Sequence, residues 1–253
     1  MPWQAPITDE QARHGVFSAP AHYTSGAAIG VITVDLDYPK IPGNVANAST
    51  FDFPVMYKKV EFEIERLFAG DPSLVDVVIT AAKELEAEGV RAIVGACGFF
   101  AHFQNDVANA VKVPVFLSSL TQLPLIKISL GKEQKVLVLA ADGPSVNNEM
   151  LFKVGTNKER VIVQNVGDRD VFSPIRWGKT TLDNGALIED LIDLVNKQVA
   201  KNPEIGAILL ECSDLPPYAF DLQVATGLPV YDFITLINWI HSSVVQHPYY
   251  GWL

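Results

Sequence analysis

The chain has 253 residues, of which 49% are apolar. This is enough to bury a substantial core in one large α/β domain or two smaller ones, so we expect a folded chain. The 29 acidic residues outnumber the 19 Lys and Arg residues and give a net charge of −10. Because no basic block occurs along the chain, we expect neither nucleic acid nor an anionic membrane among its partners.

The sequence carries no export or cofactor signal. The first 28 residues lack the apolar stretch of a secretory signal peptide, and no apolar run approaches the ~18–20 residues that cross a bilayer, so we expect a cytoplasmic protein. Cys97 and Cys212 form neither a C-x-x-C pair nor a zinc spacing, and the histidines are scattered, so we expect no metal site. No nucleotide-binding glycine motif is present.

Short runs of β-branched and apolar residues alternate with longer amphipathic stretches, as in proteins whose strands and helices alternate around a parallel sheet. A helix is expected from Ser73, as its N-cap, to Gly89, and another has an apolar stripe from Ile188 to Val199. The expected strands are Ile29–Val34, Ala92–Val94, Val113–Leu117, Val136–Ala140, Val161–Gln164, Ala207–Leu210 and Leu228–Tyr231.

Two parts of the chain are alike at one fixed offset. The segment that ends at Cys97 lies 115 positions before the segment that ends at Cys212, and Val113-Pro114-Val115-Phe116 lies the same 115 positions before Leu228-Pro229-Val230-Tyr231. We therefore predict two similar parallel-sheet α/β domains related by a pseudo-two-fold axis, with the active site in the cleft between them. Residues 1–28 fit neither copy and are interpreted as an N-terminal arm, which either packs on a partner subunit or forms a disordered tail.

Each cysteine follows a predicted strand and precedes a predicted helix, so it lies at the carboxyl end of a sheet, where open α/β folds bind ligands. The helix expected from Phe99 to Val111 would lower the pKa of the Cys97 thiol, and its free amides could hold a carboxylate. A lone cysteine often serves only as a small buried apolar residue. Two at equivalent points of a repeat favour a paired acid and base, because inversion of a carbon centre needs one group on each face.

Four other residues have two interpretations each. Asp35 ends the first predicted strand and could orient an amino group or a thiol, or cap a helix or turn. Asn47 belongs to a loop rich in turn formers and amides, which is typical of substrate-contacting loops and of ordinary surface loops. Ser118 could donate to a carboxylate or cap a helix. His102 could tune the nearby thiol, and we expect it on the solvent side of its helix.

Over most of residues 28–240 the chain resembles the aspartate/glutamate racemase superfamily, close to its hydantoin-racemase-like branch. The resemblance implies an enzyme that works without pyridoxal phosphate or metal and uses Cys97 and Cys212 as acid and base. It also implies that the C-terminal segment completes the first domain, so that residues 29–117 plus 231–253 form one domain and 118–230 the other. The segments that carry it are Gly30–Asp35, Gly95–Phe99, Val113–Ser119, Val138–Asp142, Leu210–Asp214 and Gly227–Asp232.

The resemblance further implies which residues contact the substrate. Amino-acid racemases of this family usually have Cys-Asn-Thr at the first site and Cys-Thr-His or Cys-Thr-Glu at the second, whereas this chain has Cys-Gly-Phe and Cys-Ser-Asp. Phe99 adds bulk and removes a hydroxyl donor, which favours a more apolar acid or a cyclic hydantoin over glutamate. The implied contact residues are Asp35, Gly98, Phe99, Ser118, Asp142, Ser145, Ser213 and Asp214.

These observations predict a cofactor-independent racemase or epimerase that moves the α-proton of a small carboxylate, amino acid or hydantoin. One thiolate removes the proton, backbone amides and hydroxyls hold the developing charge, and the opposite thiol returns a proton. A decarboxylase or a cis–trans isomerase of a dicarboxylate on the same scaffold is an alternative, although decarboxylation needs only one protonating cysteine. A non-catalytic small-molecule sensor is a third interpretation. We expect a homo-oligomer.

Overall fold

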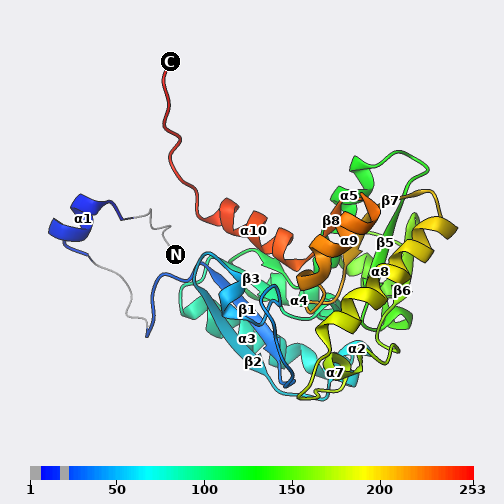
Figure 1. Ribbon diagram of the computed structural model, residues 1–253. Helices are drawn as coiled ribbons and strands as arrows, with labels where there is room; N and C mark the ends of the chain where they lie inside the picture. The colour runs from blue at the N-terminus through cyan, green and yellow to red at the C-terminus, as the bar shows by residue number, and fades with distance from the viewer. Residues whose placement is uncertain (1–6, 18–22) are drawn as a thin grey trace.

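In the computed structural model, which describes residues 7–17 and 23–253, the strands form two four-stranded parallel sheets (Figure 1). The orders β2-β1-β3-β4 and β6-β5-β7-β8 are the same in both sheets, so the predicted repeat and the predicted α/β class are confirmed. The strands are β1 (Ile29–Val34), β2 (Val55–Val60), β3 (Ala92–Gly95), β4 (Val115–Phe116), β5 (Lys135–Ala140), β6 (Val161–Asn165), β7 (Ile205–Leu210) and β8 (Val230–Tyr231).

Strand β2 is the strand that the sequence did not predict. It lies at the edge of the first sheet and pairs only with β1, with Val31 opposite Tyr57. Lys58 and Lys59 interrupt its apolar pattern, and most of its side chains are partly exposed. Charged residues on an edge strand hinder pairing with other chains, which explains why its composition differs from that of the buried strands.

The helices join consecutive parallel strands. In the first half they are η1 (Ala48–Thr50), α2 (Ile64–Phe68), η2 (Pro72–Leu74), α3 (Val75–Ala87), η3 (Gly98–Phe103) and α4 (Gln104–Ala110). In the second half they are η4 (Ser119–Gln122), α5 (Leu123–Ser129), η5 (Gly143–Ser145), α6 (Asn148–Lys153), α7 (Ser173–Arg176), α8 (Asn184–Lys201), η6 (Pro216–Tyr218), α9 (Ala219–Thr226) and α10 (Phe233–Val244).

Two helix starts differ from the prediction. Asp71 caps the 3-10 turn η2, because its Oδ1 accepts from the Ser73 amide at 2.9 Å, and the long helix α3 follows from Leu74 without a side-chain cap, so Ser73 is not its N-cap. The single helix expected from Phe99 to Val111 is instead the 3-10 helix η3 followed by the short helix α4. Only a short, irregular helix therefore begins at Cys97.

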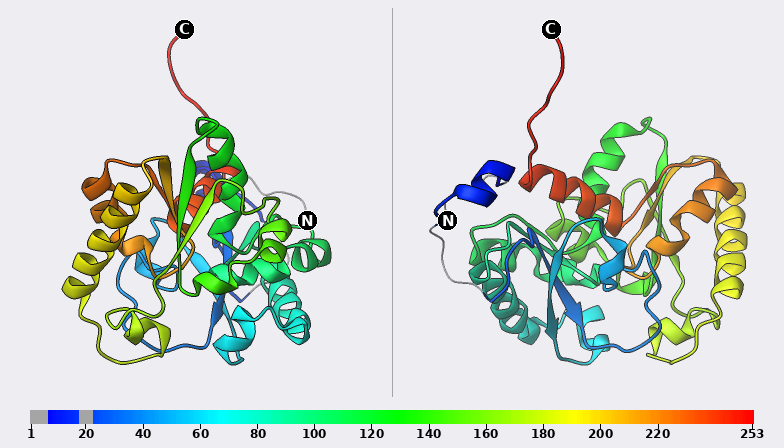
Figure 2. Two further views of the ribbon diagram at one scale, coloured as in Figure 1. Left: turned by 90° about the vertical axis from the view of Figure 1, so that its right-hand side faces the viewer. Right: turned by 60° about the vertical axis from the view of Figure 1, so that its left-hand side comes forward.

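The first sheet is covered on both faces. Side chains of β1 and β3 alternate, so Ile32 and Ile93 pack in the large core cluster that includes α3, whereas Ile29, Val31 and Val94 pack with α10. Helix α10 follows β8 of the second sheet and returns to pack on β3 of the first (Figure 2). The resemblance implied that the C-terminal segment completes the first domain, and α10 packs on the first sheet in this way. The exact domain bounds stay a prediction.

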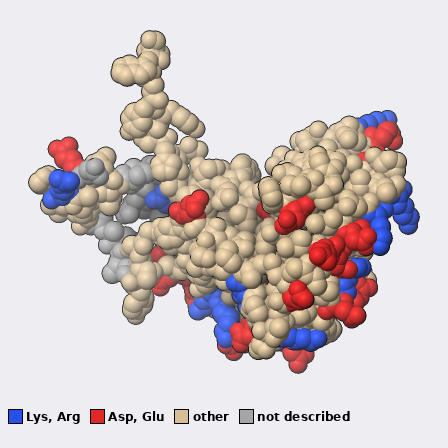
Figure 3. Space-filling view, in the orientation of Figure 1, with Lys and Arg blue, Asp and Glu red and all other residues tan. Residues whose placement is uncertain are grey.

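Helix α1 and the C-terminal residues lie away from the two sheets (Figure 1). Residues 1–6 and 18–22 of the expected N-terminal arm fall outside the described residues, and between them lies α1 (Asp9–His14), which is closed by a capping box of Thr8 and Gln11. The last eight residues extend from α10 and are exposed (Figure 1). In Figure 3 acidic and basic side chains are interspersed along the lower and right-hand edges. Over residues 7–17 and 23–253, no helix combines the length and apolar character needed to span a membrane.

Candidate active site

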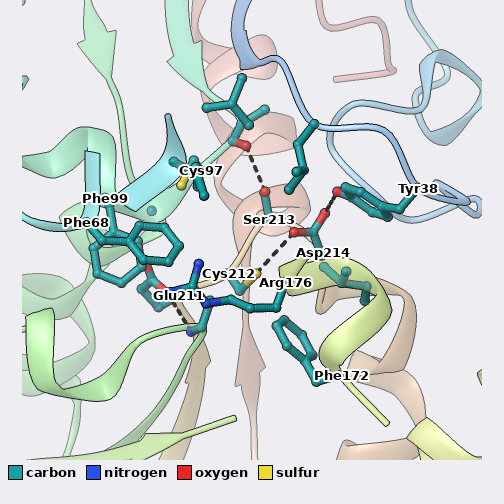
Figure 4. Close-up of a pocket in the computed structure, with 17 residues that line it drawn as sticks. Tyr38, Phe68, Cys97, Phe99, Phe172, Arg176, Glu211, Cys212, Ser213 and Asp214 are labelled. Carbon is teal, nitrogen blue, oxygen red and sulfur yellow. Dashed lines mark hydrogen bonds between the residues drawn. The ribbon is translucent and has the colours of Figure 1, made fainter. Parts of the chain in front are cut away.

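Cys97 and Cys212 line one pocket at the carboxyl ends of β3 and β7 (Figure 4). One residue separates each cysteine from its strand, Ala96 in the first sheet and Glu211 in the second. The pocket encloses about 440 Å³, part of which is open to solvent. Cys97 is partly exposed and Cys212 is buried. The equivalent strand ends of the repeat therefore bring both thiols to the same space.

Two side-chain hydrogen bonds hold the strand ends of the two sheets together, one from Ser213 beyond β7 and one from Ser119 beyond β4. The Ser213 hydroxyl donates to the carbonyl oxygen of Ala96 at 2.8 Å, and the Ser119 hydroxyl donates to that of Leu210 at the same distance. Both serines are buried. Since each bond runs from a residue beside one strand end to the backbone of the other, the two cysteines are fixed relative to each other.

Asp214 is the centre of a polar network on one side of the pocket. The Cys212 thiol donates to Asp214 Oδ2 at 3.3 Å. The Tyr38 hydroxyl and the Asn44 amide both donate to Oδ1, the latter at 2.6 Å. Burial raises the pKa of Asp214, and the donors from Tyr38, Cys212 and Asn44 act in the opposite direction. Cys212 therefore has a carboxyl group as its direct hydrogen-bond partner.

Glu211 lies on the other side of the pocket, near Phe68 and Phe99 (Figure 4). Its side chain is 0% exposed, and burial raises its pKa to about 8. Its Oε2 accepts from the Ala141 amide at 3.3 Å. A Cβ atom on Gly98 would lie only 2.0 Å from Oε1, so glycine is the residue that leaves room for this carboxyl group.

Arg176 is the cation among the residues that line the pocket. Its side chain is 10% exposed, its Nη1 lies 2.8 Å from Glu65 Oε1, and its guanidinium lies 4.3 Å above the centre of the Phe68 ring. Because a guanidinium has five N–H donors, this pairing leaves donors for a ligand carboxylate. The apolar part of the pocket wall includes Val34, Leu36, Ile64, Phe68, Ala96, Phe99, Ala141, Phe172 and Ile175.

The prediction of a lowered thiol pKa at Cys97 is wrong. Burial, followed by the charge of Glu211, raises the pKa of Cys97, although the amide of Phe99 donates a hydrogen bond to its sulfur. Burial and the charge of Asp214 likewise raise the pKa of Cys212. The helix that was expected to favour the thiolate is a 3-10 helix of six residues, so its dipole is too small to offset burial and two nearby carboxyl groups.

Four of the predicted contact residues line the pocket, namely Gly98, Phe99, Ser213 and Asp214. The other five lie outside it and have other partners. Asp35 is exposed and pairs with Lys59, with its Oδ1 3.1 Å from Nζ, and Asn47 caps η1 and donates to the Lys40 carbonyl at 2.9 Å. Ser118 caps η4, and Asp142 accepts a hydrogen bond from Ser145 at 2.8 Å. The catalytic and binding roles of all these residues stay predictions.

Three polar lining residues were not predicted from the sequence, namely Tyr38, Arg176 and Glu211. Tyr38 follows the end of β1, which is the usual position of a binding loop, so that position was an available signal. Arg176 lies on the short helix α7, whose sequence carries no site pattern. His102 is also corrected, because it is 4% exposed and thus lies in the interior rather than on the solvent side.

The pocket is not built as a metal site. Within residues 7–17 and 23–253, no three His, Cys, Asp or Glu side chains are grouped so that they could hold a metal ion. The polar lining instead combines two thiols, two carboxyl groups, a phenol and a guanidinium around an apolar wall. Such a set can bind a small carboxylate and move a proton at the adjacent carbon.

Comparison with solved structures places the chain in a known fold. An unliganded arylmalonate decarboxylase aligns with a TM-score of 0.57 and 17% identity over 88% of this chain and 94% of that protein. Allantoin racemase from Pseudomonas fluorescens aligns with a TM-score of 0.57 and 17% identity over 86% of this chain and 91% of that protein. Glutamate racemase from Francisella tularensis aligns with a TM-score of 0.54 and 19% identity over 88% of this chain and 85% of that protein. The resemblance to the aspartate/glutamate racemase superfamily is therefore confirmed at the level of the fold.

The proteins with similar sequences are named as lyases and not as racemases. No protein-family model matches the chain. Dimethylsulfoniopropionate lyase 3 of Emiliania huxleyi is 32% identical over 236 residues, which cover 88% of this chain and 61% of that protein. Dimethylsulfoniopropionate lyase of Durusdinium sp. clade D is 31% identical over 234 residues, which cover 89% of this chain and 77% of that protein. With this identity over most of both sequences, the chain belongs to the dimethylsulfoniopropionate lyase family.

Proposed function

We propose that this protein is a lyase that removes the α-proton of dimethylsulfoniopropionate, or of a closely similar β-sulfonium carboxylate, and expels the sulfide. The hydrogen bond between Cys212 and Asp214 carries the proposal, because it gives one of the two cysteines an internal proton acceptor. Elimination needs a single base, and the site supplies one thiol with a carboxyl partner at 3.3 Å.

The reaction is a β-elimination. The Cys212 thiolate takes the proton from the carbon next to the carboxylate, and the electron pair of that C–H bond becomes the new carbon–carbon double bond. The bond from the β-carbon to sulfur breaks, and its electron pair leaves on sulfur. The sulfonium cation thus becomes neutral dimethyl sulfide, acrylate remains, and the abstracted proton returns to solvent through the thiol.

The charges that line the pocket suit a zwitterion. Arg176 offers N–H donors to a carboxylate, and Asp214 offers a negative charge to a cation. Figure 4 shows Asp214 between Tyr38 and Phe172, so a sulfonium group there would lie near two aromatic side chains as well as a carboxyl group. A bound cation also opposes the effect of Asp214 on the Cys212 thiol, so substrate binding would favour the thiolate.

The racemase predicted from the sequence shares the first step of this reaction. It differs after α-proton removal, because a racemase returns a proton to the opposite face and therefore needs two thiols that exchange roles. In this pocket both sulfurs accept a hydrogen bond from the backbone two residues further on, at Phe99 and at Asp214, but of the two thiols only that of Cys212 also donates to a carboxyl group. This difference favours elimination over inversion.

The test is to incubate the purified protein with dimethylsulfoniopropionate and measure dimethyl sulfide and acrylate, which should form in equal amounts. C212S should lose this activity, whereas a surface variant such as K132A, whose side chain is exposed outside the pocket, should keep it. Amino acids and hydantoins incubated in deuterated water provide the comparison. If deuterium enters the α-position of those compounds with inversion, and no dimethyl sulfide forms, the racemase hypothesis is supported and the lyase proposal is overturned.

A further inference from the structure

Glu211 has a carboxyl group in which only one of the two oxygens has a hydrogen-bond partner among the described residues. The side chain is 0% exposed, yet it lines the pocket. Its Oε2 accepts from the Ala141 amide, whereas Oε1 has no hydrogen-bond partner among the described residues. Buried polar atoms are nearly always paired, so an unpaired one in a ligand pocket calls for a partner that arrives with the ligand.

The protonation state of Glu211 decides what that partner is. Burial raises the pKa of this carboxyl group to about 8, because an ionised carboxylate loses its hydration in an apolar environment. At neutral pH the group is therefore a neutral acid, and its O–H is a donor that needs an acceptor. The sulfonium end of the proposed substrate has no acceptor, whereas the carboxylate end has two oxygens.

We propose that Glu211 is a catalytic hydrogen-bond donor that binds the substrate carboxylate and holds the negative charge that develops there when the α-proton leaves. This inference rests on the proposed elimination. Removal of the α-proton places a second negative charge on the carboxylate oxygens, so a fixed donor there stabilises the transition state more than the bound substrate. A neutral acid does this without the repulsion that an ionised Glu211 would exert on the substrate.

The neighbours of Glu211 fit this role. The titratable groups that face it are Cys97, Cys212, Asp214 and Asp142, all of them neutral or acidic, and Arg176 lines the same pocket. None of the four can neutralise an ionised Glu211, so they favour its protonated form. The Oε1 atom also lies against Gly98, where a Cβ would come to 2.0 Å. The glycine beside Cys97 thus keeps the donor next to the cysteine pair.

The experiment compares E211Q, which keeps an N–H donor, with E211M, which has none. We expect E211M to lower kcat for dimethyl sulfide release by about 10²–10³-fold with a smaller change in KM. The kcat of E211Q should be at least about tenfold higher than that of E211M. Activity of the unmodified protein should fall as pH rises through about 8, and this fall should be absent in E211Q.

Control variants at Glu88 show whether an effect is specific to Glu211, and two outcomes would overturn the inference. E88Q and E88M replace a glutamate that also has an unpaired buried oxygen but lies at the end of α3, outside the pocket, and should leave kcat unchanged. Thermal unfolding of E211M confirms that the variant folds. The inference is overturned if E211M retains nearly full kcat. It is equally overturned if E211Q is as impaired as E211M, because the carboxylate charge would then be what matters.

A binding measurement separates this inference from the proposed function. If the unmodified protein releases no dimethyl sulfide, the proposed function fails, and Glu211 is then tested by calorimetric titration with acrylate, a simple carboxylate. Binding that is lost in E211M and kept in E211Q supports the donor role. Equal binding in both variants, or no binding by the unmodified protein, overturns it.

Discussion

Replacing Glu211 by Gln should change how the stability of this fold depends on pH. Burial raises the pKa of Glu211 from 4.5 to about 8 in the folded protein. Below the lower value the carboxyl group is protonated in both the folded and the unfolded chain, so it contributes no pH dependence. Between the two values the unfolded chain ionises and the folded protein does not, so the free energy of unfolding falls as pH rises.

The size of this effect follows from the shift. Each pKa unit corresponds to about 1.4 kcal/mol, so between about pH 5 and pH 7.5 Glu211 removes about 3 kcal/mol from the free energy of unfolding. Gln has no charge to lose at any of these pH values, so E211Q should be free of this contribution. The free energy of unfolding of E211Q relative to the unmodified protein should therefore rise by about 3 kcal/mol over the same interval.

Urea unfolding at the two pH values measures this difference directly. E211M provides the matched control, because it also lacks the titrating group and should show the same pH dependence as E211Q. Parallel curves for the unmodified protein and both variants would refute the reasoning, since Glu211 would then titrate alike in the folded and unfolded chains. The measurement requires no substrate and so does not depend on the proposed activity.

Three further predictions concern the activity. C212S should lower kcat by about 10²–10⁴-fold and C97S by less, and equal losses in dimethyl sulfide release would contradict the proposed difference between the thiols. Y38F removes a hydrogen-bond donor that lowers the pKa of Asp214, so the pKa of that carboxyl group should rise further and the acid limb of the pH–rate profile should move to higher pH. An unmoved limb would exclude this role. K132A changes an exposed side chain outside the pocket, and kcat/KM should stay nearly constant.

The features that the sequence predicted well depend on local patterns. Seven of the eight strands were recognised, because buried parallel strands are short apolar runs between turn residues. The offset of 115 positions between Cys97 and Cys212 revealed the repeat, and the same strand order in both sheets confirms it. Since carboxyl ends of parallel strands share one edge, the sequence also placed both thiols where the pocket lies.

The features that it missed depend on contacts between distant segments. Glu211 follows an apolar strand and has the sequence pattern of a polar strand end, and only its packing against Gly98 of the other half shows that it is buried. Arg176 reaches the pocket because Glu65 and Phe68, more than a hundred positions earlier, hold its guanidinium. Asp35 follows β1 and pairs with Lys59 of the edge strand that was not predicted, a contact that the local sequence pattern did not indicate.

The residues beside the two cysteines explain how one fold can support both inversion and elimination. The backbone repeat places equivalent thiols at equivalent strand ends, and a racemase needs this equivalence because each thiol must act as acid and as base. In this chain the residue before the cysteine is Ala96 in one half and Glu211 in the other, and the residue two positions after it is Phe99 or Asp214. A carboxyl group that accepts a proton is thus bonded to one thiol alone. In the proposed elimination, Cys212 with its carboxyl partner would carry out the α-proton step, and no second proton transfer to the opposite face would be needed.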